Sequence, residues 1–287
     1  MSLREYRGPD GPEVELPAGD VTEGVVRVGQ TVRRPAQPHS AAVAGYLDHL
    51  AAVGFDGAPR YLGRDRAGRE VLTYLPGDVA GDPPPAWAAE QDLLVSVAHL
   101  LRDLHEASAG YAAEDAFAPP AGSRWMDLPL PSDADPARVP AMPAPELVSH
   151  NDVTPQNVVV QNGRAVGLVD FDLAGPTTRL QEVWTTAMYW VPLRDPADLW
   201  PAWRKVDQAR RLRVFADAYG LPQAERDALV GVGAAHAERA WWRMKGAAEH
   251  LGGGWARMWA AGVGDAIARR GTWVSQHADE LTRALLD

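Results

Sequence analysis

A polar loop that runs into two short apolar stretches constrains the fold of this chain more than any other feature. The loop is residues 149–157 (Ser-His-Asn-Asp-Val-Thr-Pro-Gln-Asn), and the apolar stretches are residues 158–160 and 167–169. Between them lies the sequence Gln161-Asn162-Gly163-Arg164. An Asn-Gly pair flanked by β-branched residues is one of the strongest short-range hairpin signals. We therefore predict a β-hairpin that begins after the polar loop.

Polar side chains stand at both ends of this hairpin. Asp152 precedes it, Asn157 lies at its first shoulder, and Asp170 follows its second strand. Phosphoryl transfer needs one acid to receive the proton of a hydroxyl, and an amide and a second acid to hold Mg²⁺ on nucleotide phosphates. Taken singly, these residues would more often be turn formers or strand caps. Their order around one hairpin favours a catalytic site.

The spacing also resembles a known family. His150-x-Asp152-x-x-x-x-Asn157, an apolar strand and then Asp170-Phe171-Asp172 are similar to the catalytic and metal-binding segments of the aminoglycoside phosphotransferase family. This resemblance implies an α+β, two-lobed protein-kinase-like fold, with a small β-rich N-terminal lobe and a larger, mainly helical C-terminal lobe. We expect the lobes to be residues 1–75 and 76–287.

The resemblance also implies roles for individual residues. It implies Mg²⁺ as cofactor and ATP or GTP as phosphoryl donor. Asn151 replaces the family's usual glycine, which is tolerable because asparagine accepts left-handed backbone angles. The expected roles are Asp152 as general base or hydroxyl-orienting residue, Asn157 and Asp170 as metal ligands, His150 as an anchor of the loop to the second strand, Asp172 as a contact to a second metal or a basic group, and Glu182 as a brace for the loop backbone.

The N-terminal lobe is expected to bind the nucleotide. A glycine loop that ends at Gly24 would lie over the phosphates, and Arg33 or Arg34 would grip them where the family usually has lysine. Neighbouring residues of a strand point in opposite directions, so only one arginine can face the cleft. We favour Arg33, because in the family the cation often stands two residues before a proline. Tyr74 and Leu75 are expected to present backbone groups to the base, although a plain exit from the strand is an equal alternative.

The one helix expected in this lobe, residues 40–53, departs from the family. Family helices carry a glutamate near their start that pairs with the lysine. Here Asp48 is the only acid, and it lies near the other end. Either another group such as Glu23 holds the arginine, or no such ion pair forms.

The remainder of the chain is expected to be helical. Apolar residues at helical spacing predict helices at residues 87–107, 207–219, 223–245 and 254–286. Most of the tryptophans in this part are expected in the core, and His105 is expected to be structural. By resemblance, the acceptor would lie between the catalytic loop and the late helices, where Glu238 or Glu249 would meet its amines.

Composition narrows the classes of protein. The 287 residues contain no cysteine, which excludes disulfides and thiolate chemistry, and the formal net charge of −10 argues against nucleic acid as a partner. The same charge suits a cationic substrate, although solubility alone explains it. No signal peptide or membrane span is evident, so we expect a cytoplasmic protein without a membrane partner.

These features predict a small-molecule kinase that transfers the γ-phosphoryl group of ATP or GTP to a hydroxyl. By resemblance, the acceptor is an antibiotic of aminoglycoside or related type, which would make the protein a resistance or self-resistance enzyme. One alternative is a metabolic kinase of a simple alcohol of choline or homoserine type. Another is a catalytically silent, kinase-like binding or immunity protein, which the missing helix glutamate and the arginine in place of lysine support.

Overall fold

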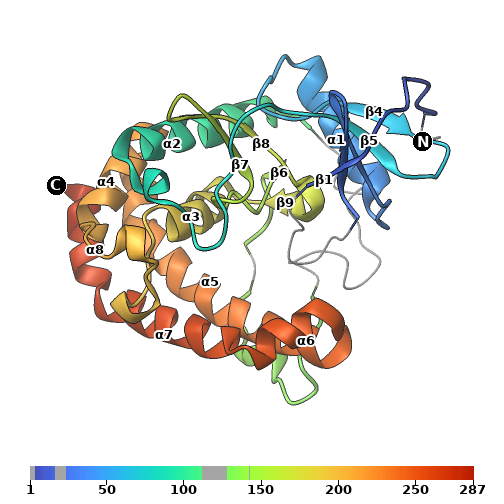
Figure 1. The fold of residues 1–287 in the computed structure, drawn as a ribbon. Helices are drawn as coiled ribbons and strands as arrows, with labels where there is room; N and C mark the ends of the chain where they lie inside the picture. The colour runs from blue at the N-terminus through green and yellow to red at the C-terminus, as the bar shows by residue number, and fades with distance from the viewer. Residues whose placement is uncertain (1–3, 17–23, 112–127, 142) are drawn as a thin grey trace.

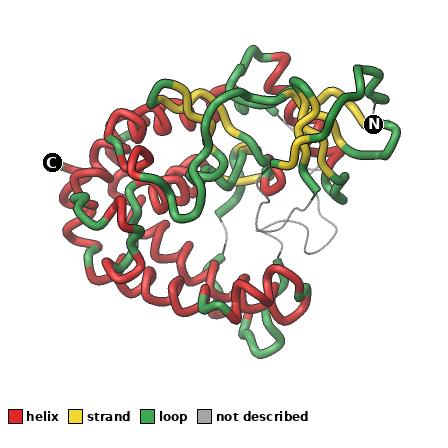
Figure 2. Tube along the Cα trace, in the orientation of Figure 1, coloured by secondary structure: helices red, strands yellow, loops and turns green. Residues whose placement is uncertain are grey.

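The chain divides into a sheet-based part and a larger helical part. The computed structural model describes residues 4–16, 24–111, 128–141 and 143–287. Strands gather at the N-terminal end of the molecule, and helices fill the opposite end (Figures 1 and 2). This α+β, two-lobed arrangement confirms the predicted fold class.

One antiparallel sheet of five strands forms the N-terminal part, in the order β1-β2-β3-β5-β4. Alternating buried and less buried residues run along β2 and β4, as expected for strands with one face on the core. Helix α1 (Ser40–Ala52) buries Tyr46, Leu47 and Leu50 in the core. The strands are β1 (Val14–Glu15), β2 (Val26–Val28), β3 (Thr31–Arg34), β4 (Tyr61–Arg64) and β5 (Glu70–Thr73).

The segment after β5 passes directly over the predicted hairpin. Asp78 and Val160 exchange two backbone hydrogen bonds, of 2.9 and 2.8 Å. Gly77 has φ +141°, and a Cβ at this position would lie 2.6 Å from Val159 Cγ1 and 2.7 Å from the Val160 carbonyl oxygen. Only glycine permits this close approach. The crossing holds the five-stranded sheet beside the polar loop.

The hairpin forms as the Asn-Gly signal predicts. Strands β7 (Val158–Gln161) and β8 (Arg164–Leu168) pair antiparallel. Asn162 and Gly163 have φ values of +51° and +74°, the left-handed conformations that a two-residue hairpin turn needs. A second short pair, β6 (Leu147–Ser149) with β9 (Gly175–Thr177), flanks the loop. The sequence analysis missed β9, because Gly-Pro-Thr has neither alternation nor a β-branched run.

The helices differ from the sequence predictions mainly at their ends. Helix α2 starts at Gln91 rather than residue 87, because Glu90 is extended after a short 3₁₀ turn. The single helix expected at 254–286 is three helices, since Gly262 takes a left-handed conformation (φ +92°) and His277 interrupts the next turn. The helices are α2 (Gln91–Ala107), α3 (Arg179–Trp190), α4 (Gln208–Tyr219), α5 (Gln223–His250), α6 (Gly253–Ala260), α7 (Val263–Gln276) and α8 (Ala278–Leu286).

The C-terminal core is built largely from aromatic and leucine side chains. Trp184, Trp190 and Trp203 are almost completely buried, as is Phe215 of α4. This agrees with the expectation that most tryptophans serve packing, because an indole removes a large apolar area from water. The described part of the chain contains no helix with the length and apolar character needed to cross a membrane.

Candidate active site

The predicted catalytic loop is closed by contacts between two of its own residues. Nδ2 of Asn157 donates to Asp152 Oδ2 at 2.8 Å and to the Asp152 carbonyl oxygen at 3.0 Å. Asn157 is buried, so its amide has one fixed orientation. Both of these bonds use the amide nitrogen, which leaves the amide oxygen as the atom that can coordinate a cation. The structure therefore brings Asp152 and Asn157 together, as the spacing predicts.

A buried glutamate fixes the backbone of the loop. Asn151 has φ +63°, and its backbone N–H donates to Glu182 Oε1 at 2.6 Å. The Asn151 side chain donates to the carbonyl oxygens of Leu173 and Gly175, at 3.2 and 3.1 Å. The left-handed conformation is the one expected of an asparagine in place of glycine. Glu182 lies in the first turn of α3, so this helix positions the loop.

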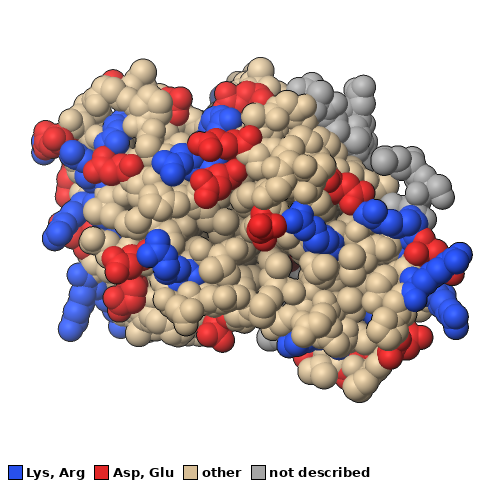
Figure 3. Space-filling model, turned by 90° about the horizontal axis from the view of Figure 1, so that it is seen from above, with Lys and Arg blue, Asp and Glu red and all other residues tan. Residues whose placement is uncertain are grey.

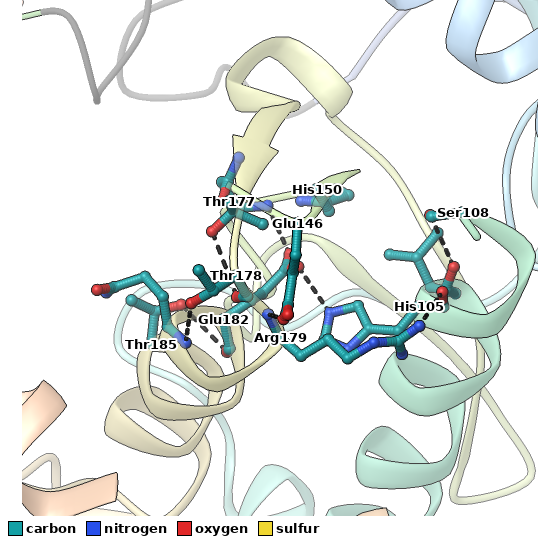
Figure 4. A network of polar contacts seen from close by, with 12 residues as sticks. His105, Ser108, Glu146, His150, Thr177, Thr178, Arg179, Glu182 and Thr185 are labelled. Carbon is teal, nitrogen blue, oxygen red and sulfur yellow. Dashed lines mark hydrogen bonds and ion pairs between the residues drawn. The ribbon is translucent and has the colours of Figure 1, made fainter. Parts of the chain in front are cut away.

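His105 in turn positions Glu182. Its Nε2 lies 2.9 Å from Glu182 Oε2 (Figure 4). Its Nδ1 lies 2.7 Å from the Tyr219 hydroxyl. Burial by itself would raise the pKa of Glu182, but the hydrogen bond and charge of His105 hold that pKa below its ordinary value. The carboxylate therefore stays ionised and accepts from the loop. The sequence placed His105 correctly as structural but gave no sign of its partner, which is 77 residues away.

His150 joins the loop to the end of the hairpin. Its Nε2 donates to the Val169 carbonyl oxygen at 2.9 Å, and the Asp152 N–H donates to its Nδ1 at 3.2 Å. Its ring meets Phe171 edge to face, with centroids 4.5 Å apart. Burial lowers the pKa of His150, so the ring is neutral, as these two hydrogen bonds require. These contacts match the anchoring role expected of it.

Two acids follow the hairpin in an irregular turn. Asp170 has φ +61° and ψ +67°, a left-handed conformation uncommon for aspartate, and a 3₁₀ turn (Phe171–Leu173) comes next. Strand alternation therefore does not extend beyond Asp170. Burial, and then the negative charge of Asp172, raise the pKa of Asp170 to about 6, against the opposing effect of Arg34. Two carboxylates this close create a site that attracts a cation.

Arg34, not Arg33, reaches these acids. Its Nη1 lies 2.5 Å from Asp172 Oδ1 and 3.7 Å from Asp170 Oδ1. Arg33 points to the other face of β3, where it pairs with Asp10 at 2.9 Å and Asp65 at 3.6 Å. The preference for Arg33 is therefore wrong about which side chain faces the acids. Alternation along β3 was anticipated, but only the placement of the sheet decides which face meets the C-terminal part.

Glu70 supplies the ion pair that α1 lacks. Residues 34 and 70 are direct cross-strand partners of β3 and β5, and Arg34 Nε donates to Glu70 Oε2 at 3.1 Å. Both side chains are buried, at 7% and 2% exposed. Asp48 of α1 instead contacts Arg4, and Glu23 lies outside the described residues. The cross-strand register of β3 and β5 is the signal that reveals Glu70.

The other residues expected to bind the nucleotide are only partly placed. Gly24 is exposed with φ +78°, and residues 19–23 of its loop lie outside the described part of the chain. The Tyr74 N–H donates to the Gln30 carbonyl oxygen at 2.9 Å, so this amide is used within the sheet and is not available to a base. Leu75 packs against Gly167, where a Cβ would lie 2.9 Å from Leu75 Cδ1.

The residues at the acids fit Mg²⁺ delivered with a nucleotide. The described residues contain no group of three or more His, Cys, Asp or Glu that could hold a metal ion alone. They do offer two hard oxygen donors at the two ends of the hairpin, the Asp170 carboxylate and the amide oxygen of Asn157. Mg²⁺ is commonly held by one or two protein carboxylates, with phosphates and water completing its shell. The donor set therefore suits a metal shared with nucleotide phosphates.

Comparison with known proteins identifies the family. The model of the phosphotransferase enzyme family (APH) matches residues 19–229, which include the loop, the hairpin and both acids. The chain belongs to this family. A curated relative, the trifolitoxin immunity protein of Rhizobium leguminosarum bv. trifolii, is 30% identical over 224 residues, covering 76% of this chain and 78% of the relative.

Solved structures share the fold at lower identity. A putative aminoglycoside phosphotransferase from Ralstonia eutropha JMP134 has a TM-score of 0.57 at 16% identity, covering 94% of this chain and 95% of its own. A choline/ethanolamine kinase family protein from Mesorhizobium loti also has a TM-score of 0.57, at 20% identity, covering 96% and 92%. The GDP complex of aminoglycoside 2'-phosphotransferase-IIIa has a TM-score of 0.54 at 14% identity, covering 96% and 93%.

Proposed function

We propose that this member of the phosphotransferase family is a Mg²⁺-dependent small-molecule kinase that uses ATP or GTP. The observation that carries the proposal is the pairing of Asp152 with Asn157 at 2.8 Å, in a loop braced by Glu182. A binding protein without turnover has no chemical need for an acid held in this way. The family match and the nucleotide-bound structure of a relative with this fold support the proposal.

The residues divide the reaction between them. Asp152 orients the acceptor hydroxyl and receives its proton, while that oxygen forms a bond to the γ-phosphorus and the bond to the leaving nucleoside diphosphate breaks. Asn157 and Asp170 would hold Mg²⁺, which neutralises charge on the phosphates. Arg34 lies beside the acids and would contact the phosphates through its planar guanidinium. The roles of Glu182 and His150 are to position the loop.

Two acceptor classes are suggested by the names of relatives. Neighbouring structures are called aminoglycoside phosphotransferases, which supports an antibiotic of aminoglycoside or related type and a role in resistance. A choline/ethanolamine kinase family neighbour supports a simple alcohol. Both classes carry amino or ammonium groups, so each would need acids near the acceptor hydroxyl.

A second candidate function is immunity by binding, without turnover. The 30% identical relative named trifolitoxin immunity protein favours it. The short contact between Arg34 and Asp172 also favours it, because the acid competes with nucleotide phosphates for the Arg34 guanidinium. The two candidates differ in whether the acids are used to bind Mg²⁺ and nucleotide.

Calorimetric titration of Mg·ATP, and separately Mg·GTP, into wild type and Asp170→Ala tests the proposal. We expect micromolar binding that requires Mg²⁺ and weakens at least about tenfold in the variant, equivalent to about 1.4 kcal/mol. Asp103→Asn, at an exposed position of α2, is the matched control and should bind like wild type. Folded wild-type protein that binds neither nucleotide would refute the kinase proposal and leave the immunity role as the better candidate.

Catalysis is tested by Asp152→Asn. Nucleotide affinity should change little, whereas transfer of γ-phosphoryl from radiolabelled nucleotide should fall by about 10²–10⁴-fold, the range expected for loss of a general base. Acceptors for this assay should include aminoglycosides, choline and hydroxy acids. Turnover that survives the substitution would show that Asp152 is not the base.

A further inference from the structure

Arginines gather along the helix that supports the catalytic loop. Glu182 in the first turn of α3 binds the loop, and Tyr189 lies two turns further along the same face of that helix. The Arg194 guanidinium lies 5.7 Å from the centroid of the Tyr189 ring and 4.3 Å from the Trp200 ring. Arg270 of α7 also reaches α3, with its Nη1 2.9 Å from Met188 Sδ. This is the region between the catalytic loop and the late helices where an acceptor is expected.

These two arginines have donor groups without partners. Arg194 is 7% exposed, and neither its Nε nor its Nη2 has a hydrogen-bond partner among the described residues. Nε of Arg270 is likewise buried and without a partner in the described part of the chain. Buried N–H groups are normally satisfied, and each exception calls for an explanation such as a missing ion. The geometry leaves several guanidinium donors for a group that is not part of the described chain.

Nearby carboxylates do not neutralise the pair. Asp198 is bound by Arg269 through both oxygens, at 2.9 and 2.6 Å. Burial, and then the charge of Arg270, lower the pKa of Arg194 to about 10, while Tyr189, Asp198 and Asp82 act in the opposite direction more weakly. Like charges buried together are costly unless an anion compensates them.

In the described part of the chain, neither glutamate expected to meet the amines of an acceptor is among the charged groups that act on Arg194 and Arg270. Glu238 is exposed on α5. Glu249 accepts hydrogen bonds from the backbone N–H and hydroxyl of Ser132 at the far end of that helix. Acidic and basic side chains are interspersed over the face shown in Figure 3.

We propose that the phosphoryl acceptor of this kinase carries an anionic group, a carboxylate or a phosphate, that Arg194 and Arg270 bind. The inference rests on the proposed kinase function and favours an acceptor other than the aminoglycoside and choline types, which carry amino or ammonium groups and no such anion. A guanidinium matches the planar fork of a carboxylate or two oxygens of a phosphate, and such charge-assisted pairs are strong when water is excluded. The acceptor hydroxyl would then reach Asp152 while the anionic end lies against α3 and α7.

The test uses D-glycerate and inorganic phosphate as probes of the two anion types. Each is titrated calorimetrically into the full chain saturated with Mg·ADP, which leaves only the γ-phosphate position of the nucleotide site open to phosphate. Phosphate bound there would bind equally well to the arginine variants described next. We expect wild type to bind at least one probe, and Arg194→Gln and Arg270→Gln each to weaken that binding at least tenfold. Arg257→Gln, at an exposed position of α6, is the control and should bind like wild type.

Thermal unfolding separates a binding role from a structural one. If the arginines only support the fold, Arg194→Gln should lower Tm with or without anion. If they form a binding site, removing an uncompensated buried charge should leave Tm unchanged or raise it, and only the anion-dependent rise in Tm should disappear. The inference would be overturned if wild type binds Mg·ADP but neither probe, or if the variants bind the probes as well as wild type does. Either outcome would leave the kinase proposal standing. Failure of wild type to bind Mg·ADP would overturn the kinase proposal itself.

Discussion

The pair formed by Arg34 and Glu70 gives a prediction that can be worked from the structure. Glu70→Gln keeps the size of the side chain and one acceptor oxygen but removes the charge opposite Arg34. Breaking a buried ion pair by removing one partner typically costs about 3–5 kcal/mol. Arg34 keeps Asp172 at 2.5 Å, and glutamine can still accept from Arg34 Nε, so we expect a smaller loss. We therefore expect Glu70→Gln to lower the free energy of unfolding by about 2 kcal/mol.

Chemical denaturation followed by tryptophan fluorescence measures this loss. For a chain of this size, about 2 kcal/mol corresponds to a fall in Tm of about 3–4 °C. The matched control is Asp56→Asn, which removes the acid of an ion pair with Arg60 whose side chains are 92% and 35% exposed. Exposed pairs of this kind contribute little, so the control should stay within about 0.5 kcal/mol of wild type.

The same variant should weaken nucleotide binding. Without Glu70, only Asp170 and Asp172 hold Arg34, and its guanidinium is no longer presented in one orientation. We expect the Kd for Mg·ATP to rise about tenfold, equivalent to about 1.4 kcal/mol. If Glu70→Gln unfolds at the same denaturant concentration as Asp56→Asn and binds nucleotide like wild type, Glu70 does not position Arg34.

Three further predictions concern protonation and the loop brace. Burial is the main reason why the pKa of Asp170 is raised to about 6, so calorimetry should show Mg·nucleotide affinity falling by up to about tenfold per pH unit below pH 6. Asp172→Asn removes a like charge and should move the pH at which this fall begins to a lower value. The pKa of His236 is lowered to about 3 by burial and neighbouring arginines, so the unfolded chain binds a proton below pH 6.5 that the folded chain does not. Stability should therefore fall by up to about 1.4 kcal/mol per unit as pH drops below 6.5 in denaturation series, with a shallower slope in His236→Gln. Glu182→Gln should lower the free energy of unfolding by about 1–3 kcal/mol, because the Asn151 N–H loses a charged acceptor. The same change should reduce kcat more than nucleotide affinity. An unchanged kcat would show that Glu182 does not position the loop.

Local chemistry made much of the loop predictable from sequence. The Asn-Gly turn specifies the hairpin, and the hairpin brings Asp152 and Asn157 together with little help from the rest of the chain. Asn151 has the left-handed backbone that asparagine tolerates, and Glu182 opens the helix after the loop and accepts from the Asn151 N–H. The bracing role of Glu182 stays a prediction. Each of these features depends on residues near each other in sequence or on a turn with strong preferences.

Register and long-range contacts were beyond such reasoning. Whether Arg33 or Arg34 faces the acids depends on how the sheet packs on the C-terminal part, which no local pattern encodes. Glu70 is 36 residues from Arg34 in sequence, and its role appears only when β3 and β5 are paired. The three helices after α5 were read as one, because apolar spacing continues across Gly262 and hides the break.

Placing the Arg34 ion pair between two strands changes what can regulate this site. In protein kinases the equivalent pair joins a strand to a helix, and moving that helix turns the enzyme off. Here α1 carries no partner for Arg34, so a displacement of α1 would leave the pair intact. The register of β3 against β5 instead determines which arginine faces the acids, because a slip of one residue would turn Arg34 away and bring Arg33 to them. The position of Arg34 therefore depends on the strand register and not on the position of α1.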